Sequence, residues 1–377
     1  MPVKNYIPFT TGEDVTQTRT LLHEVLPLTG TIVSGTYGGF RTERNIKNYS
    51  HGMFQSVYDY AYLSSSANHI FDITLGYDKT SILSGTTGTI PQQKKKINMY
   101  NQFAQLLLGY TGSTTDGIRK FESDLTLDGV GYLKQAFVIS FSRLLTKDQI
   151  KKGSFSIALG TGSWASPFMN GATSAVRTLA DVSASVSTTG VQVCDGGEYG
   201  LLYDSKENNL VKGLIFYQAG IAVISSSVWA QDSRRGGHTA PGVIWSGSTT
   251  QFNQPHHSAP SVFQDVTASM ASSSISSSTD ALRHRIQNIS YNNTTEINSK
   301  IYFCRVPFNA FNYSSNPTYT SGSKIVVKST TTDMPVSYVT TVGLYNDGGE
   351  LLAVAKLSEP LRKDPTNDMT IRVRLDY

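Results

Sequence analysis

The sequence predicts an α+β fold that is mainly β, with antiparallel meanders, sandwich-like sheets, a few helices and long loops. Short runs of alternating apolar and polar residues are separated by Gly, Asn and Asp, which is typical of hairpins. One long segment has a clear helical periodicity. Strand and helix signals do not alternate along the chain, so we do not expect a parallel sheet.

Residues 1–130 are expected to form a mixed region of helix and strand. A short helix is predicted over 14–26, and aromatic residues at helical spacing predict another over 46–63. Residues 70–75 alternate between apolar and polar side chains and predict a strand that ends at Gly76.

The clearest helix of the sequence covers residues 94–110. Its apolar side chains recur three and four residues apart, Pro91 marks its entry, and Gly109 lies where it would end. The lysine run at 94–96 is predicted to be a solvated helix start. Because the run has no interleaved arginine or stacking aromatic residue, it does not indicate nucleic-acid binding.

Residues 131–230 predict an antiparallel β region. A long strand is expected over 132–145, followed by a capping box at 146–149 and a further strand over 155–159. A meander comes next, with strands expected at 199–203, 211–217 and 220–225.

Residues 231–279 are rich in Gly, Pro and Ser and have little periodicity. They predict a projecting arm or a long connection. Loops of this length are uncommon inside compact domains, so we expect the arm to be functional, mobile or ordered only against a partner.

Residues 280–377 predict a short helix, capped by Asp280, followed by a β-meander. A tight hairpin is expected at 346–349, because Asp-Gly and Gly-Gly tolerate the positive φ of such turns. The strands of the meander are expected at 301–306, 324–328, 336–345, 350–357 and 369–375.

The composition favours a protein that acts through surface contacts. Only 16% of the residues are charged, against about 25% in an average soluble protein. A surface of uncharged polar side chains docks with little desolvation of charge. The net charge of +4 indicates no cationic face, so no nucleic-acid partner is expected.

No apolar run approaches the roughly 20 residues of a membrane-spanning helix, so no membrane insertion is expected. The first residues contain no apolar signal segment, and we expect folding in the cytosol. Cys194 and Cys304 lie in different segments without metal-ligand spacing and are expected to be free, mostly buried thiols.

Motifs of common enzyme classes are absent from the sequence, including the P-loop, His-Glu-x-x-His and Gly-x-Ser-x-Gly. Asp195, Glu198 and Asp204 cluster around a predicted hairpin and could supply the carboxylate pair of a glycoside hydrolase. Turn chemistry is the favoured interpretation of these acids. We therefore predict that the chain is not an enzyme and has no catalytic residue and no cofactor.

Histidines of the arm are the candidate ligands for a metal ion. His256 and His257 are adjacent, and His238 precedes them. Adjacent residues of an extended chain point in opposite directions, which argues against both binding one ion in a single subunit. We predict no metal site and assign the adjacent pair to an interface instead.

The segment at 308–323 carries aromatic residues among small polar ones. It is either a recognition loop whose rings fill pockets on a neighbour, or an irregular segment held against its own core. On the last strand, Arg372 and Arg374 alternate onto one face and could pair across an interface. The predicted interface residues are Phe308, Phe311, Tyr313, Tyr319, His256, His257, Arg372 and Arg374.

Long phrases of the sequence resemble virion structural proteins of contractile-tailed, T4-like bacteriophages of aquatic bacteria. The phrases begin ISYNNTTEIN at 289, FNYSSNPTYT at 311 and YVTTVGLYND at 338, and FSRLLTKDQI at 141 begins another. The similarity covers 135–160 and 289–377.

The resemblance implies a structural subunit of the virion, placed in the tail baseplate wedge and assembled in the host bacterial cytoplasm. The implied partners are copies of the chain itself and other tail or baseplate proteins, with fibre attachment as one role. The alternatives are a neck, connector or capsid-associated protein, and then a receptor- or glycan-binding tail protein. The family brings no catalytic residues.

Overall fold

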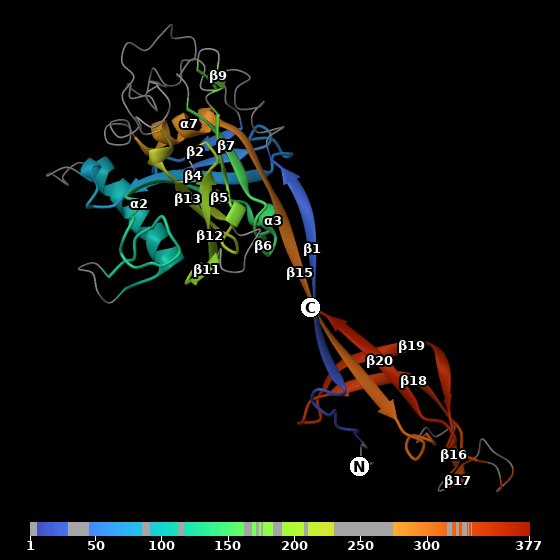
Figure 1. Ribbon diagram of the computed structural model, residues 1–377. Helices are drawn as coiled ribbons and strands as arrows, with labels where there is room; N and C mark the ends of the chain where they lie inside the picture. Colours follow the sequence, from blue (N-terminus) through green and yellow to red (C-terminus); the bar gives the residue numbers. More distant parts are fainter. Residues whose placement is uncertain are drawn as a thin grey trace. The chain divides into compact units, whose positions relative to one another are not determined.

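The computed structural model has a mainly β fold with a few helices, and its strand pairs with a described register are antiparallel, which confirms the predicted α+β, mainly β class (Figure 1). The structure describes residues 6–28, 45–84, 91–111, 117–161, 168–170, 173–174, 176–183, 191–206, 210–229, 274–314, 319–321, 324–325, 330, 332 and 334–377.

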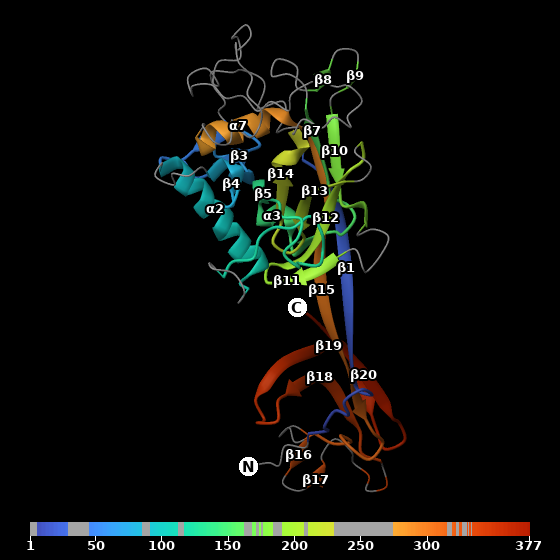
Figure 2. The same ribbon diagram turned by 60° about the vertical axis from the view of Figure 1, so that its left-hand side comes forward.

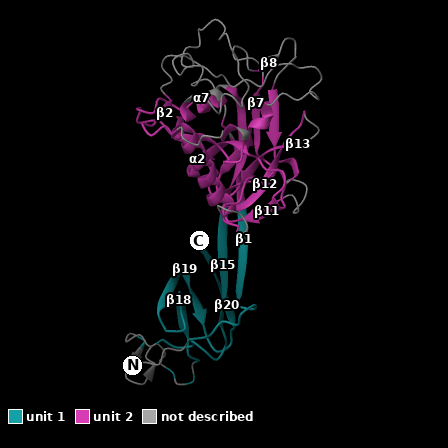
Figure 3. Cartoon of the chain, turned by 90° about the vertical axis from the view of Figure 1, so that its left-hand side faces the viewer, with its two compact units in different colours: residues 1–21, 296–377 teal, residues 22–295 magenta. Residues whose placement is uncertain are grey.

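The chain folds into two compact units (Figure 3). Unit 1 consists of residues 1–21 and 296–377, and unit 2 of residues 22–295. Strands β1 (Val15–Pro27) and β15 (Ile286–Val306) each contain a boundary between the units. Unit 2 thus draws on the first three regions expected from the sequence and on the beginning of the fourth.

Unit 2 is built around an antiparallel sheet with the strand order β15-β7-β10-β12-β13-β14-β5-β4-β3-β2. The predicted meander forms β12, β13 and β14, and the predicted strands at 70–75 and 155–159 lie in β4 and β7. The strand bounds are β2 (Ile46–Asn48), β3 (Gln55–Tyr58), β4 (His69–Tyr77), β5 (Gln135–Phe141), β6 (Gln149–Ile150), β7 (Ser156–Gly160), β8 (Met169–Asn170), β9 (Thr173–Ser174), β10 (Val176–Ala180), β11 (Val191–Cys194), β12 (Gly197–Asp204), β13 (Leu210–Phe216) and β14 (Ile221–Ser225).

Both faces of this sheet are buried around β5. Phe137 and Ile139 belong to one apolar cluster, whereas Val138 belongs to the other. Helix α2 (Pro91–Leu108) contributes Ala104 and Leu107 to the second cluster, and helix α7 (Ile275–Arg285) packs against β4 (Figure 2). The other helices in the described part of the chain are α3 (Arg143–Thr146), η1 (Ile82–Ser84) and η3 (Ser226–Trp229).

Helix α2 confirms the helix predicted over 94–110, and it begins three residues earlier, at Pro91. Gly109 follows it with φ of +77°, a conformation that glycine adopts without steric cost. The expectation of a solvated lysine run was wrong for Lys96, which is fully buried. At this position the helix backbone lies against β4, where an added Cβ at Gly76 would lie 2.6 Å from the Lys96 carbonyl oxygen.

Unit 1 pairs β15 with β20 (Met369–Asp376), and it pairs β18 (Ser337–Tyr345) with β19 (Leu351–Lys363). The core between them contains Val306, Leu344, Ile371 and Val373. The predicted hairpin at 346–349 is confirmed, with Gly349 at φ of +78°. Short strands β16 (Thr320–Ser321) and β17 (Lys324–Ile325) complete the unit, and residues 326–328 of the strand predicted at 324–328 lie outside the described residues.

The helix predicted over 14–26 was wrong, because this segment forms strand β1. The β-branched residues of VTQTRT favour an extended backbone, and backbone pairing with β15 stabilises it. The helix predicted over 46–63 was also wrong. This segment forms β2 and β3, separated by a turn in which Gly52 has φ of +62°, which no helix accommodates.

Two predicted helix starts were wrong as well. Residue Thr146 ends α3 rather than opening a capping box, and Lys147 stops the helix with φ of +57°. Helix α7 begins at Ile275 rather than at Asp280, so the last residues of the predicted arm are helical. The helix ends at Arg285, and residues 286–289 already belong to β15. Residues 230–273, which include most of the predicted arm, lie outside the described part of the chain.

Candidate functional site

The aromatic segment of unit 1 presents exposed rings on an ordered loop. Phe308, Phe311 and Tyr313 are 56%, 41% and 66% exposed. Tyr319, by contrast, is buried, and its hydroxyl donates a hydrogen bond to the carbonyl oxygen of Val336. The structure therefore divides this group between two roles: one ring is held in the unit's own core, and three face outward.

A buried lysine holds this loop in place. Lys363, at the end of β19, is fully buried, and its ammonium group donates to the carbonyl oxygens of Phe308 (3.3 Å) and Asp364 (2.8 Å) and to Oδ1 of Asn312 (2.7 Å). An ammonium group has three donors, and all three are used here. Charge-assisted bonds of this kind are stronger than neutral ones, so the lysine fixes the backbone of the loop.

Further contacts of the loop come from its own residues and from β18. Asn312 Nδ2 donates to the Phe308 carbonyl oxygen at 2.7 Å, and Ser337 Oγ donates to the Phe311 carbonyl oxygen at 2.5 Å. Phe311 adopts a φ of +58°, which is rare for an aromatic residue. We refer to residues 308–313 with their anchor Lys363 as the aromatic loop.

A second exposed apolar surface of unit 1 lies on the β18–β19 hairpin. Tyr345 and Leu351 cover Gly343, and Leu352 and Val354 of the same hairpin are also exposed. The ring centroids of Tyr6 and Tyr345 are 4.9 Å apart. Exposed apolar surface of this kind is typical of interaction sites.

The two predicted arginines of β20 differ in their contacts. Arg374 donates from Nε to Asp376 Oδ1 at 2.7 Å and from Nη2 to Ser299 Oγ at 3.0 Å. Hydrogen bonds from Ser299 and Arg374 lower the pKa of Asp376. Arg372 is exposed and lies opposite Phe303 of β15. The predicted His256 and His257 lie outside the described residues.

The three acids considered for hydrolysis lie at opposite ends of β12, with Asp195 and Glu198 at one end and Asp204 at the other. Glu198 forms an ion pair with Lys152 at 2.7 Å, and Asp195 lies in the β11–β12 turn beside Gly109. Asp204 is buried near the far end of β12, and six residue steps from Glu198 correspond to roughly 20 Å along a strand. The carboxylate pairs of glycosidases lie roughly 5–10 Å apart, so these two do not form one.

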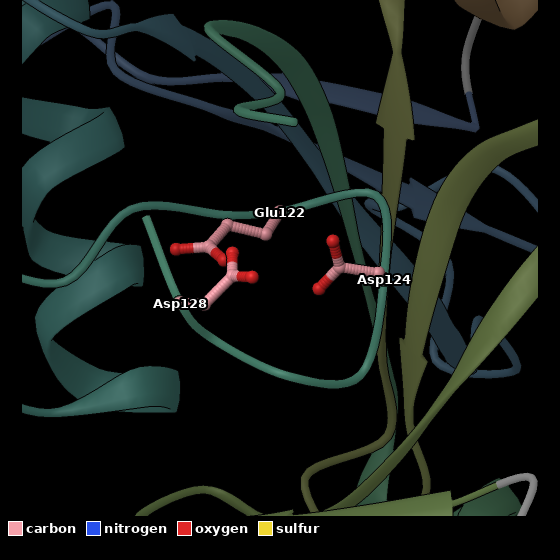
Figure 4. A group of neighbouring side chains, drawn as sticks. All are labelled: Glu122, Asp124 and Asp128. Carbon is pink, nitrogen blue, oxygen red and sulfur yellow. The ribbon is translucent and has the colours of Figure 1, made fainter. Parts of the chain in front are cut away.

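Sequence analysis missed another acidic group, at a loop between α2 and β5. Figure 4 shows Glu122, Asp124 and Asp128 extending into this loop, with Asp128 next to Glu122. One carboxylate oxygen of each lies within 4.8 Å of the others. Burial raises the pKa of Glu122, and the neighbouring Asp124 and Asp128 add to the shift. The spacing of acids at 122, 124 and 128 is the sequence signal that could have drawn attention to it.

Some carboxylate oxygens of this acidic group already accept hydrogen bonds from other residues of the loop. Both oxygens of Glu122 accept from the Gly129 amide at 3.1 Å, and Asp124 Oδ1 accepts from the Thr126 amide and hydroxyl. Oxygen ligands suit Ca²⁺ or Mg²⁺, so these residues could hold such a cation. Exposed acids also gather in loops without one, and the group has no further feature that points to a ligand.

Comparisons of the chain with protein-family models, with curated proteins and with solved structures gave no match. The resemblance to phage virion proteins therefore stays a prediction. Among the described residues, no helix is long and apolar enough to cross a membrane.

Proposed function

We propose that the chain is a structural subunit of a tailed-phage virion, located in the baseplate wedge, and that it acts by docking onto copies of itself and onto other tail proteins. The observation that carries this proposal is the aromatic loop, in which exposed rings are held by a buried ammonium group. The resemblance of the C-terminal third to virion proteins is the reason for proposing a phage virion as the assembly in which the chain docks.

Two physical arguments support docking through this loop. Aromatic side chains are enriched among the residues that dominate binding energy at protein interfaces. A loop already fixed by Lys363 loses little conformational entropy on association, so more of its contact energy appears as affinity. The low charge of the chain adds to this, because few ions must be desolvated.

The proposal can be tested in the virion with a double substitution, Phe308→Ser and Tyr313→Ser. Both side chains are exposed, so the fold should tolerate their loss, whereas docking loses two anchors. We expect incorporation into purified particles, measured by mass spectrometry, to fall at least about tenfold.

The matched control is Leu144→Ser, which removes an apolar side chain that is 83% exposed in unit 2 and should leave incorporation unchanged. Equal incorporation of the double variant and the wild-type chain would overturn docking through the loop. Absence of the wild-type chain from particles would overturn the virion role.

The alternatives place the same docking chemistry elsewhere. A neck, connector or capsid-associated protein would also be incorporated, but at another position in the particle. A receptor- or glycan-binding tail protein would keep the aromatic loop exposed in the assembled virion.

A further inference from the structure

A row of polar side chains crosses the outermost strands of unit 2. The register places Lys47 of β2 opposite Ser56 of β3, and Ser56 opposite Asp72 of β4. Their neighbours Val57 and Phe71 are fully buried in the core. Since successive side chains alternate between the faces of a sheet, the polar row lies on the face opposite this core.

Partly buried aromatic rings surround this row. The rings of Tyr49 and His51 are stacked, with their centroids 5.1 Å apart. The ring centroids of Phe54 and Tyr49 are 4.8 Å apart. The ring centroid of Tyr58 lies 5.5 Å from that of His69 and 6.3 Å from that of Tyr62. The Lys47 ammonium lies 4.8 Å from the centre of the Tyr49 ring. We call the row and these rings the Tyr58 surface.

The carboxylate of Asp72 is the fixed centre of the Tyr58 surface. Its Oδ1 accepts hydrogen bonds from Ser56 Oγ and from His69 Nε2, the latter at 2.9 Å. Ser56 Oγ also lies 3.1 Å from the Tyr49 hydroxyl. Within the described residues, no bond to Asp72 Oδ2 is formed, and the side chain is 35% exposed. The carboxylate is therefore held by one oxygen and offers the other to a ligand.

The hydroxyl group of Tyr58 stays protonated. Burial, followed by the neighbouring Tyr49 and Asp72, raises the pKa of Tyr58, and its hydroxyl is hydrogen-bonded to Tyr49. Lys95 of α2 donates to the carbonyl oxygen of His51 at 2.9 Å and ties this part of the surface to the helix. The rings and polar groups are thus arranged before any ligand binds.

We propose that the Tyr58 surface binds a neutral saccharide. A sugar ring has C–H bonds on its faces, which suit the partly exposed rings, and hydroxyls at its edge, which can donate to Asp72 and accept from Lys47. A few fixed polar groups among aromatic side chains is the usual composition of small-ligand sites. An anionic ligand would meet the Asp72 carboxylate, and a broad protein face would desolvate both charges.

This inference goes beyond a role in assembly and can be tested on the intact chain. The first probe is a glycan array that carries neutral and anionic oligosaccharides. The second is calorimetric titration with the neutral glycan that binds best, compared among the wild-type, Asp72→Asn and Tyr62→Ala proteins. Tyr62 makes a ring contact at the edge of the surface, so its loss should leave the fold intact.

We expect neutral glycans to bind, with affinity at least about tenfold lower for Asp72→Asn, because a charged acceptor is lost. Tyr62→Ala should lower it about threefold or more, because stacking area is lost. The unit 1 variant Phe308→Ser, Tyr313→Ser is the matched control and should bind like the wild type. Binding to no glycan, binding to anionic glycans alone, or wild-type affinity in both Asp72→Asn and Tyr62→Ala would each overturn the proposal.

Discussion

Lys363 shows how one residue determines the properties of the aromatic loop. Removing an ammonium group from water costs several kcal/mol unless hydrogen bonds replace the lost hydration. Here three oxygen atoms replace it, and two of them belong to the loop. The exposure of the aromatic rings therefore depends on a residue that is itself fully buried.

Replacing Lys363 with Met should destabilise unit 1 by about 2–4 kcal/mol, because buried acceptors lose their donors. Hydrogen exchange should accelerate at the backbone amides of 308–313. Denaturant unfolding and exchange mass spectrometry would measure both effects. The control Lys356→Met, on an exposed position of the same strand, should stay within about 0.5 kcal/mol of the wild type. Unchanged exchange in the loop would contradict the anchoring role.

Helix α2 illustrates an element whose position against a strand determines the charge state of a side chain. Gly76 allows the helix to lie against β4, and Lys96 of this part of the helix is fully buried. Burial lowers the pKa of Lys96 to about 8. The folded chain thus binds this proton more weakly than the unfolded chain does, and folding carries the cost of the charge below pH 8.

The stability difference between the wild type and Lys96→Met should therefore depend on pH. The lowering of the pKa from 10.5 to about 8 limits this change to about 3 kcal/mol. Between pH 8 and 10.5 the unfolded chain retains the proton longer, so wild-type stability should rise relative to that of the variant.

Urea unfolding at several pH values would measure this difference, with the exposed Lys94→Met as the control. Wild-type stability that stays constant or falls relative to the variant between pH 8 and 10.5 would contradict the assignment.

At the scale of the whole molecule, local patterns predicted the fold class but not the division into units. Strands β12 to β14 and the hairpin at 346–349 follow from alternation and turn residues, which act over a few positions. Strand β1 depends on pairing with β15, more than 250 residues away, and no local signal contains that partner. Unit 1 combines both ends of the chain for the same reason.

The candidate sites follow the same division between local and distant information. The sequence identified Phe308, Phe311 and Tyr313 by their type, whereas their support by Lys363 comes from more than 50 residues away. The segment carrying Tyr58 was predicted to be a helix, so the alignment of Ser56 with Asp72 could not be foreseen. Residue types identified candidate binding residues, but contacts between distant segments of the chain determine which of them lie side by side.

Docking within a phage baseplate through the aromatic loop can be tested by cryo-electron microscopy of purified particles. We expect density for the chain at the tail baseplate, with Phe308 and Tyr313 covered by a neighbouring subunit. Density at the neck or capsid would contradict the baseplate assignment. A loop left open to solvent in the assembled particle would contradict docking through it.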